Sequence, residues 1–309
     1  MSQSEPASVP RLSVVVALIS GRPEHLETCL TALTQQADPP AMEIVVPCDK
    51  RVGDVSRFRA RFPAVHFIPS AEKSAGGNSD WSREHHDELR ALGLQHARGE
   101  IVALTEDHCK VGERWCATID KEHAAAHAVI GGAVENGTNR LLNWAVYFCD
   151  FGRYQNPVPR GPAEFLSDCN IAYKRKALEA TADLWKDAYH EESVNWALRK
   201  LGHSFWQCPE MVVWQQREKM SLTAALRERY VWGRSYAGTR VAESEPGKRL
   251  FYVAFSFLLP ALLLARMGAN VLRKRRHVVK FILAAPLAAL LTVGWSVGEF
   301  IGYVTRRPH

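Results

Sequence analysis

Short apolar runs that alternate with amphipathic segments constrain the fold of the first third of the chain. Four of them have the length and β-branched content of buried strands: Leu12–Ile19, Glu43–Val46, Val65–Ile68 and Ile101–Leu104. The segments that begin at Pro23 and span Glu84–Ala97 have helical periodicity, and Gly99 ends the second one. This order predicts an α/β fold with a mixed, mostly parallel sheet flanked by helices.

An acidic cluster follows the fourth predicted strand directly. Glu106, Asp107 and His108 offer two carboxylates and an imidazole there. Ligands in parallel sheets bind beyond the carboxyl ends of the strands, and hard oxygen ligands suit Mg or Mn. The cluster therefore predicts a metal site with Glu106 and His108 as ligands and Asp107 as a ligand or a ribose contact. The alternative is a solvated acidic turn without a ligand.

A second carboxylate begins the helix predicted for Glu191–Leu201, which Gly202 ends. Glu191 shares one face with Val194, Leu198 and Leu201, so it points into the fold or a cleft, where it can act as a general base. The helix dipole favours its ionised form, and an acid that only complements this dipole is the alternative. Glu192 lies about 100° around the helix, which fits that second role better.

The tail differs from the rest in charge. From Arg227 onward, 14 Lys and Arg stand against four Asp and Glu, within a chain whose net charge is +6. The remainder is therefore mildly acidic. Because the basic residues of the tail flank apolar runs and form no polar, aromatic-studded face, they predict a membrane-lipid partner and no nucleic acid.

Two apolar runs predict how the tail meets a membrane. Phe281–Val304 is long enough to span a bilayer or lie deep in it, with Leu250–Ala265 as its partner. A hairpin with the catalytic part and Arg306-Arg307 in the cytoplasm would place Arg273–Arg276 outside, against the positive-inside tendency. A re-entrant or interfacial first segment, broken at Pro260, resolves that conflict. A soluble helical hairpin is the alternative.

Other segments carry weaker signals. Residues 1–10 are polar and predict a disordered N-terminus without a secretory signal. Asn136–Asp168, rich in aromatic residues and proline, predicts an irregular region over the sheet edge, either structural or substrate-binding. The seven cysteines include no CxxC pair, which favours a reducing compartment. Cys109 is interpreted as a buried structural thiol.

Six segments in one order resemble the family 2 glycosyltransferases of the GT-A fold, over roughly residues 11 to 235. They are "SVVVALISGRPEHLETCLTAL" (13–33), "EIVVPCD" (43–49), "GLQHARGE" (93–100), the 106–108 cluster at the Asp-x-Asp metal motif, "SDCNIAYKR" (167–175), and His190–Gly202 at the base motif. The resemblance implies an α/β GT-A catalytic domain of the membrane-associated bacterial type. The segment "RERYVWGR" (227–234) resembles the Gln-x-x-Arg-Trp motif of processive members only loosely.

The resemblance implies roles for further residues. Asp49 would contact the nucleotide, Asp168 and Asn170 would bind substrate, and Glu192 would lie beside the base Glu191. A turn-stabilising role is the alternative for Asn170. The motif departs from the family at Glu106 and His108, where the family has two aspartates.

The sequence thus predicts a disordered segment 1–10, a catalytic domain 11–245 and membrane-associated helices 246–309. The predicted activity is metal-dependent, inverting transfer of a sugar from a nucleotide-sugar donor to a glycan or lipid-linked acceptor, at the membrane on the cytoplasmic side. The alternatives are a catalytically inactive membrane-tethered binding module and a nucleotidyltransferase of similar fold. The second would need a basic Gly-rich loop after the first strand, where the chain has only Ser20-Gly21-Arg22-Pro23.

Overall fold

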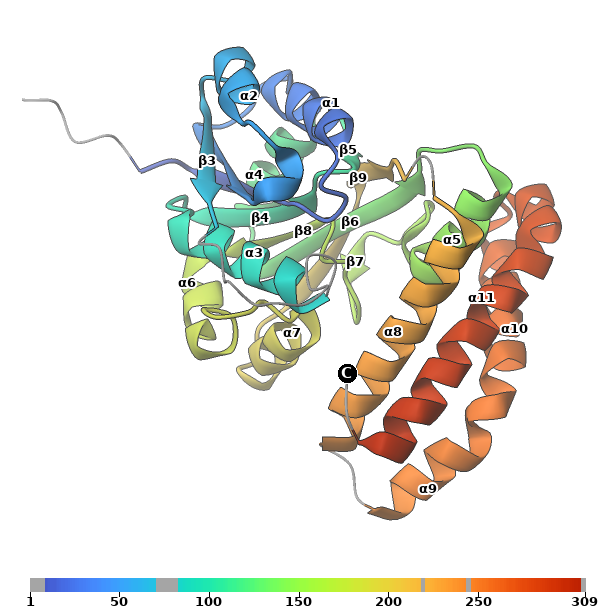
Figure 1. Cartoon of the computed structure of the whole chain (residues 1–309). Coiled ribbons are helices and arrows are strands. Elements are labelled where there is room, and N and C mark those ends of the chain that lie inside the picture. The colour runs from blue at the N-terminus through green and yellow to red at the C-terminus, as the bar shows by residue number, and fades with distance from the viewer. Residues whose placement is uncertain (1–8, 71–82, 218–219, 243–245, 307–309) are drawn as a thin grey trace, which may run out of the picture. The chain divides into compact units, whose positions relative to one another are not determined.

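The computed structural model describes residues 9–70, 83–217, 220–242 and 246–306, and the chain forms two compact units (Figure 1). Unit 1 comprises residues up to Val134 and Asn156–Gln216; unit 2 comprises Glu135–Gln155 and Arg217 onward. Most of the segment predicted to be disordered, residues 1–8, lies outside the described residues.

Unit 1 is built from strands and helices that alternate along the chain. Its strands are β1 (Leu12–Ala17), β2 (Met42–Cys48), β3 (Val65–Pro69), β4 (Ile101–Glu106), β5 (Cys109–Val111), β6 (Val129–Asn136), β7 (Gly161–Pro162), β8 (Ile171–Lys174) and β9 (Phe205–Gln215). Its helices are α1 (Pro23–Thr34), α2 (Ser56–Arg61), α3 (Arg83–His96), α4 (Trp115–His123), α6 (Arg175–Glu179) and α7 (Glu191–Lys200). The 3-10 turns are η1 (Lys50–Val52) and η4 (Ala182–Leu184).

These strands form one mixed sheet in the order β3-β2-β1-β4-β8-β6-β9-β5, with β7 paired to β9. The β3-β2-β1-β4 half is parallel, and β8 joins β4 antiparallel. Ala17 of β1 pairs with Glu106 of β4, so the loops that follow these two strands emerge side by side. The expected mixed α/β sheet is confirmed, and its parallel half brings three strand ends to one edge.

Helices cover both faces of the sheet. On one face, α3, α6 and α7 contribute to a single hydrophobic cluster with the strands; Leu94, Leu178 and Leu198 pack there with Val15 and Tyr173. On the other face lie α1 and α4 (Figure 1). Leu26 and Leu30 of α1 are fully buried, as their spacing predicted. Helices packed on both faces hold the sheet in place, and the predicted site residues lie at one edge of it.

Unit 2 contains a helix in the region predicted to be irregular. It comprises α5 (Leu141–Asp150), η3 (Gly152–Tyr154), α8 (Leu222–Ala242), α9 (Pro246–Phe255), η5 (Ser256–Leu258), α10 (Leu259–Lys274) and α11 (Val278–Thr305). Trp144 and Phe148 of α5 share a cluster with Ala284, Ala288 and Leu291 of α11. The boundary between the units therefore lies well before residue 245, because α5 and α8 pack with the C-terminal helices.

Helices α8 and α11 run in the same direction in close contact. A Cβ atom added at Gly294, Gly298 or Gly302 would come within 3.5 Å of the Leu226 oxygen, 2.1 Å of the Tyr230 oxygen and 2.5 Å of the Arg234 oxygen, respectively. The three pairs advance in steps of four residues on both helices, which is the relation of parallel neighbours. Only glycine permits the approach at Gly298 and Gly302, whereas the distance at Gly294 is an ordinary van der Waals contact.

The ends of the helices are fixed by polar contacts within unit 2. At one end, Arg276 donates to Glu135 (2.6 Å) and Lys274 to the Arg153 oxygen (2.8 Å). At the other end, Arg249 at the start of the returning helix donates to the Tyr303 oxygen (2.8 Å). The basic turn Arg273–Arg276 thus joins α10 to α11 at the end where the chain enters unit 2.

Two stretches have the length and apolarity to cross a membrane, Gly247–Lys274 and Val278–Thr305, each of 28 residues. Only 6% and 22% of their most apolar windows are buried within the protein. A soluble core helix of the same composition would be mostly buried. The exposed side chains include Phe257, Leu262, Ile282, Leu283 and Val297.

Candidate active site

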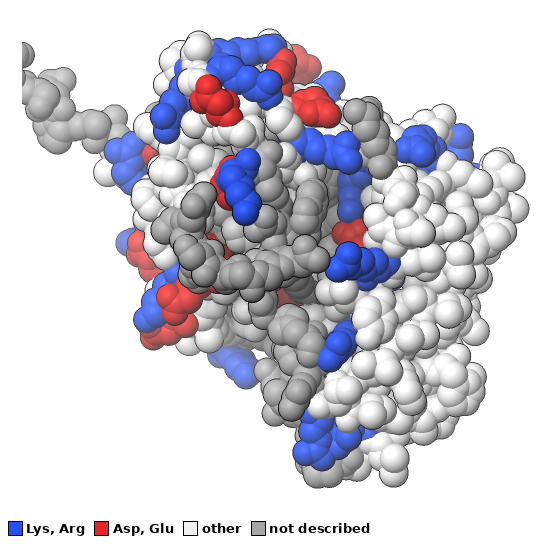
Figure 2. All heavy atoms as spheres, viewed as in Figure 1, with Lys and Arg blue, Asp and Glu red and all other residues white. Residues whose placement is uncertain are grey.

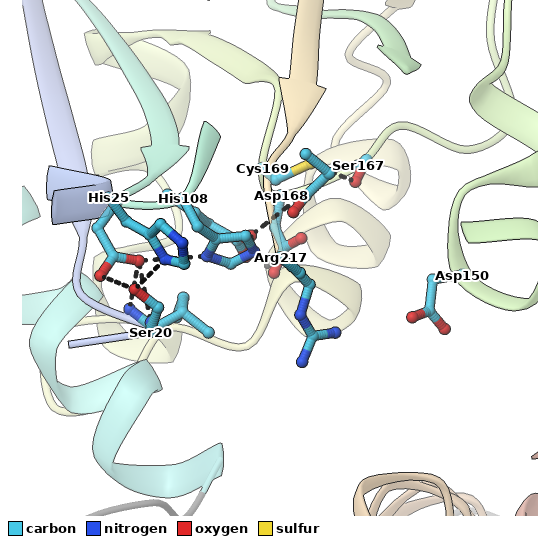
Figure 3. Close-up of polar contacts among 12 residues, drawn as sticks. Ser20, His25, His108, Asp150, Ser167, Asp168, Cys169 and Arg217 are labelled. Carbon is cyan, nitrogen blue, oxygen red and sulfur yellow. Dashed lines mark hydrogen bonds and ion pairs between the residues drawn. The ribbon is translucent and has the colours of Figure 1, made fainter. Parts of the chain in front are cut away.

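The carboxyl ends of β1, β2 and β4 meet at one edge of the sheet. Glu106 is the last residue of β4, and Asp107 and His108 follow it into a turn. Ser20 and Gly21 follow β1, and the Asp107 amide donates to the Ala17 oxygen (2.9 Å). Figure 3 shows Ser20, His25 and His108 drawn together at this edge. This is the position predicted for the acidic cluster.

Asp107 is fully buried and holds the loop between β1 and α1. Its Oδ1 accepts hydrogen bonds from the amides of Ile19 (3.1 Å) and Ser20 (3.0 Å). Its Oδ2 accepts from the Gly21 amide (2.9 Å) and the Ser20 hydroxyl (2.7 Å). Burial alone would raise the pKa of Asp107, but hydrogen bonds from His108 and Ser20 outweigh it, and the pKa is lowered. Asp107 therefore stays ionised, with both oxygens bonded to this loop.

His108 lies between the two carboxylates of the cluster. Its Nδ1 is 3.2 Å from Oδ1 of Asp107 and its Nε2 is 3.3 Å from Oε2 of Glu106. If Nδ1–H donates to Asp107, the lone pair of Nε2 is left facing Glu106. A carboxylate that fixes a histidine tautomer in this way is typical of metal-ligating histidines. Glu106 and His108 thus fit a divalent cation, with Asp107 as the group that orients the imidazole.

Glu106 is itself held on both oxygens. Oε1 accepts from Nη2 of Arg90 (2.9 Å), and Oε2 accepts from Nε2 of Gln215 on β9 (3.1 Å). The side chain is buried, and the Arg90 guanidinium compensates its charge. Oε2 of Glu106 and Nε2 of His108 are the atoms that would hold a cation here.

Arg90 joins the acidic cluster to the acceptor-side segment. This buried residue of α3 donates to Asp87 (3.0 Å) and Glu106, and its Nη2 lies 3.0 Å from Oδ2 of Asp168. Burial opposes its charge, but Asp168, Asp87 and Glu106 outweigh that effect and raise the pKa of Arg90 further above its usual value. The sequence reasoning missed this residue. Its spacing to Leu94 and Ala97 on the inward face of the helix was the available signal.

Glu191 is the first residue of α7, as predicted, and its side chain is partly buried. The Asn195 amide donates to its Oε1 (3.2 Å). Burial, and then the charges of Asp168 and Glu192, raise the pKa of Glu191 well above its usual value. Burial thus acts against the helix dipole, which favours the ionised form. Glu192 is exposed to solvent.

Asn170 lies in the core of the sheet. Its side-chain oxygen accepts from the indole of Trp115 (2.8 Å), and its amide nitrogen donates to the oxygens of Ala133 (2.9 Å) and Met211 (2.8 Å). The residue is fully buried. This geometry fits the structural alternative for Asn170, because the side chain ties β6 to β9 and faces no open surface.

Asp49 follows β2, and His85 of α3 lies against it. Oδ2 of Asp49 is 2.7 Å from Nε2 of His85. The Asp49 side chain is 11% exposed. The sequence pointed to Asp49 as the nucleotide contact but gave His85 no role.

A second donor set lies nearby. One ligand atom each from Glu106, Cys109 and Cys169 fall within 4.8 Å of one another, and all three residues are buried. Burial raises the pKa of both thiols. Because only the thiolate binds metal well, and binds soft ions, this set does not suit Mg or Mn.

Comparisons with known proteins give a fold and no family. No protein-family model matches the chain, and no curated protein matches it in sequence. A solved structure of the mannosyltransferase PcManGT from Pyrobaculum calidifontis, in complex with GDP-Man and Mn²⁺, is similar with a TM-score of 0.55 at 15% identity. The match covers 96% of this chain and 88% of that one. S. aureus TarS 1-349 gives a TM-score of 0.47 at 15% identity, over 96% of this chain and 90% of that one. The chain therefore has the fold of this mannosyltransferase, which confirms the predicted fold class.

Proposed function

We propose that the protein is a glycosyltransferase that uses a nucleotide-sugar donor and a divalent metal, and that inverts the anomeric centre. The observation that carries this proposal is the relation of His108 to its two neighbours: Nδ1 faces Asp107 while Nε2 faces Glu106 at 3.3 Å. That arrangement lies at the carboxyl end of a central strand, where sheets of this class bind ligands. The fold shared with a protein solved with GDP-Man and Mn²⁺ supports the same class of ligand.

Glu106 and His108 would hold the cation, and Asp107 would orient His108. A bound Mg or Mn would neutralise charge on the diphosphate leaving group. Arg90 fixes Oε1 of Glu106, so that Oε2 remains directed toward His108. The Asp49 carboxylate would contact the nucleotide, with His85 setting its orientation.

Glu191 would act as the general base. In a single displacement, the acceptor hydroxyl gives its proton to the Glu191 carboxylate as its oxygen bonds to the anomeric carbon. The bond from that carbon to the diphosphate oxygen breaks, and the electron pair leaves with the diphosphate. The raised pKa of Glu191 makes it a stronger base than an exposed glutamate. Asp168 and Glu192, whose charges act on Glu191, would bind the acceptor or position it.

The apolar helices of unit 2 place this chemistry at a membrane in our proposal. Attachment through unit 2 would present the site to a glycan or a lipid-linked saccharide at the cytoplasmic surface. The 28-residue apolar stretches with little internal burial support a lipid partner.

A donor screen tests the proposal. The full-length chain is heated with a panel of nucleotide sugars, with and without Mn²⁺; a donor that binds should raise Tm, and more so with the metal. The stabilising donor is then assayed for transfer and for hydrolysis. Binding without either reaction would identify an inactive binding module. Release of pyrophosphate from a nucleoside triphosphate and a sugar phosphate would identify a nucleotidyltransferase.

A further inference from the structure

The direction of the helices in unit 2 limits how it meets a bilayer. The chain enters unit 2 at Glu135 and Arg217, and the Asn143 side chain donates to the Arg217 oxygen (2.6 Å). The basic turn is bonded to Glu135 at this same end. From here α8 runs to the far end, α9 and α10 return, and α11 runs to the far end again.

If α9, α10 and α11 crossed the bilayer, α8 would therefore have to cross it as well. The chain reaches Gly247 at the far end only through α8, and α8 contacts α11 from Leu226 to Arg234. Yet Arg227, Glu228, Arg229, Arg234 and Arg240 all lie in α8. Within the described residues, α8 does not have the apolar composition of a membrane span.

The charged side chains of α8 favour contact with water over contact with lipid hydrocarbon. Arg227 is exposed, and Arg229 pairs with Asp150 through Nη2 and Oδ2 at 3.0 Å. In a crossing bundle Arg227 would face hydrocarbon at a level about halfway along α11, because its neighbour Leu226 lies against Gly294. Figure 2 shows Lys and Arg atoms along α8 and almost none over α10 and α11.

We propose that unit 2 lies along the membrane, with the exposed apolar side chains of α9, α10 and α11 in one leaflet and α8 on the aqueous side, so that no helix crosses. The exposed Arg273 and Arg275 of the basic turn then meet anionic headgroups at the edge of the buried face. This inference rests on the membrane attachment proposed above and is independent of sugar transfer.

The first test is a depth profile along α11. Val279, Val293 and Val304 are 69%, 45% and 44% exposed and span 25 residues, about 37 Å of helix. Each is changed singly to Cys, labelled with bimane, and quenched by lipids that carry nitroxides at shallow or deep positions, in sealed vesicles of phosphatidylcholine and phosphatidylglycerol. The unsubstituted protein gives the background of native thiols, and Tm checks the fold of each variant.

An in-plane helix predicts the same shallow depth at all three positions. A crossing helix predicts that Val293 is several-fold more strongly quenched by the deep probe than Val279 and Val304, and that result would overturn the proposal.

Sidedness provides a second, independent readout. Gly247→Cys at the far end of unit 2 and Lys121→Cys on α4 are treated with an impermeant maleimide outside the vesicles; both residues are exposed. Equal labelling without detergent is expected. Protection of Gly247→Cys while Lys121→Cys reacts would show that the helices cross.

Flotation separates failure of this inference from failure of attachment. The full chain should float with anionic vesicles and less with phosphatidylcholine alone. A chain that stays at the bottom of the gradient as a dimer would show that the apolar face binds a second copy, and both the attachment and its orientation would be wrong. The transfer assay with a soluble acceptor is unaffected by either outcome.

Discussion

Arg90 reaches Glu106 through Nη2 at 2.9 Å, and the same nitrogen lies 3.0 Å from Asp168. One buried cation thus bridges the end of β4 and the segment before β8, which are 62 residues apart in sequence. In our proposal the first carboxylate holds the metal, and the second acts on the base Glu191. Arg90 therefore compensates the negative charge both at the proposed metal ligand Glu106 and at Asp168 beside the proposed base.

Removal of this cation should destabilise the fold. Arg90→Met leaves Asp87, Glu106 and Asp168 without their shared partner, and the loss of one member of a buried ion cluster costs about 3–5 kcal/mol of unfolding free energy. Urea denaturation of the variant and of the unsubstituted protein measures this loss of unfolding free energy. Arg114→Met, which breaks an exposed pair with Asp38 (2.8 Å), is the matched control and should cost less than about 1 kcal/mol. Equal losses would contradict the bridging role.

Metal binding should depend on Asp107 through His108. Asp107→Asn weakens the acceptor that fixes the imidazole, so the apparent Mn²⁺ affinity in donor binding should fall by about 10–100-fold. Because Asp107 also holds the 19–21 loop, Tm is measured alongside. Glu106→Gln with His108→Ala should abolish the metal dependence altogether. Full activity of the unsubstituted protein in EDTA would exclude the metal role.

The nucleotide contact should appear in the donor KM. Asp49→Ala is expected to raise the KM for the donor far more than it lowers kcat, because it removes binding that is uniform along the reaction. His85→Ala should have a smaller effect in the same direction, since it removes only the partner of the carboxylate. An unchanged KM for Asp49→Ala would place the nucleotide elsewhere.

The two glutamates of α7 provide a matched pair for the base. Glu191→Gln should retain donor binding and cut transfer by about 100-fold or more, the scale of lost general-base help. Glu192→Gln alters an exposed neighbour and should do much less. The reverse outcome would show that the base lies one residue further along the helix.

Glu191 should also leave a signature in pH dependence. Its folded-state pKa is raised, so between the unfolded value of about 4.3 and the folded value the native state binds the extra proton. Stability relative to Glu191→Gln should therefore decrease as pH rises through that window, and transfer should increase over the upper part of it. Denaturation curves and kcat/KM measured from pH 4 to 9 test both. A stability difference that increases with pH would indicate a lowered pKa.

The sequence predicted the central strands and the acidic cluster because both follow local rules. A buried strand that ends in Glu106-Asp107-His108 needs no distant information. Arg90 could not be placed in the same way, because its partners Glu106 and Asp168 come from the end of β4 and the segment before β8. The helical spacing of Arg90 predicts its inward position. Its role depends on ion pairs with residues that are distant in the sequence.

Helix α5 was missed for a different reason. Leu141–Asp150 lies in a segment rich in aromatic residues and proline, and that composition outweighed the helical pattern of its apolar residues. Its faces are buried against α11, and that packing, absent from local sequence, makes it a helix. The same packing moves the unit boundary away from residue 245.

The backbone contact between α8 and α11 divides the surface of α11 into two regimes of mutational tolerance. Gly298 and Gly302 face peptide oxygens of α8, and any larger residue there must force the helices apart. Val293 and Val297 are about half exposed and meet no such limit. In a saturation library selected for folded protein, these two glycines should be nearly fixed, while the valines should exchange freely among apolar residues. Helix α11 thus tolerates substitution on its exposed side and hardly any on the side that faces α8.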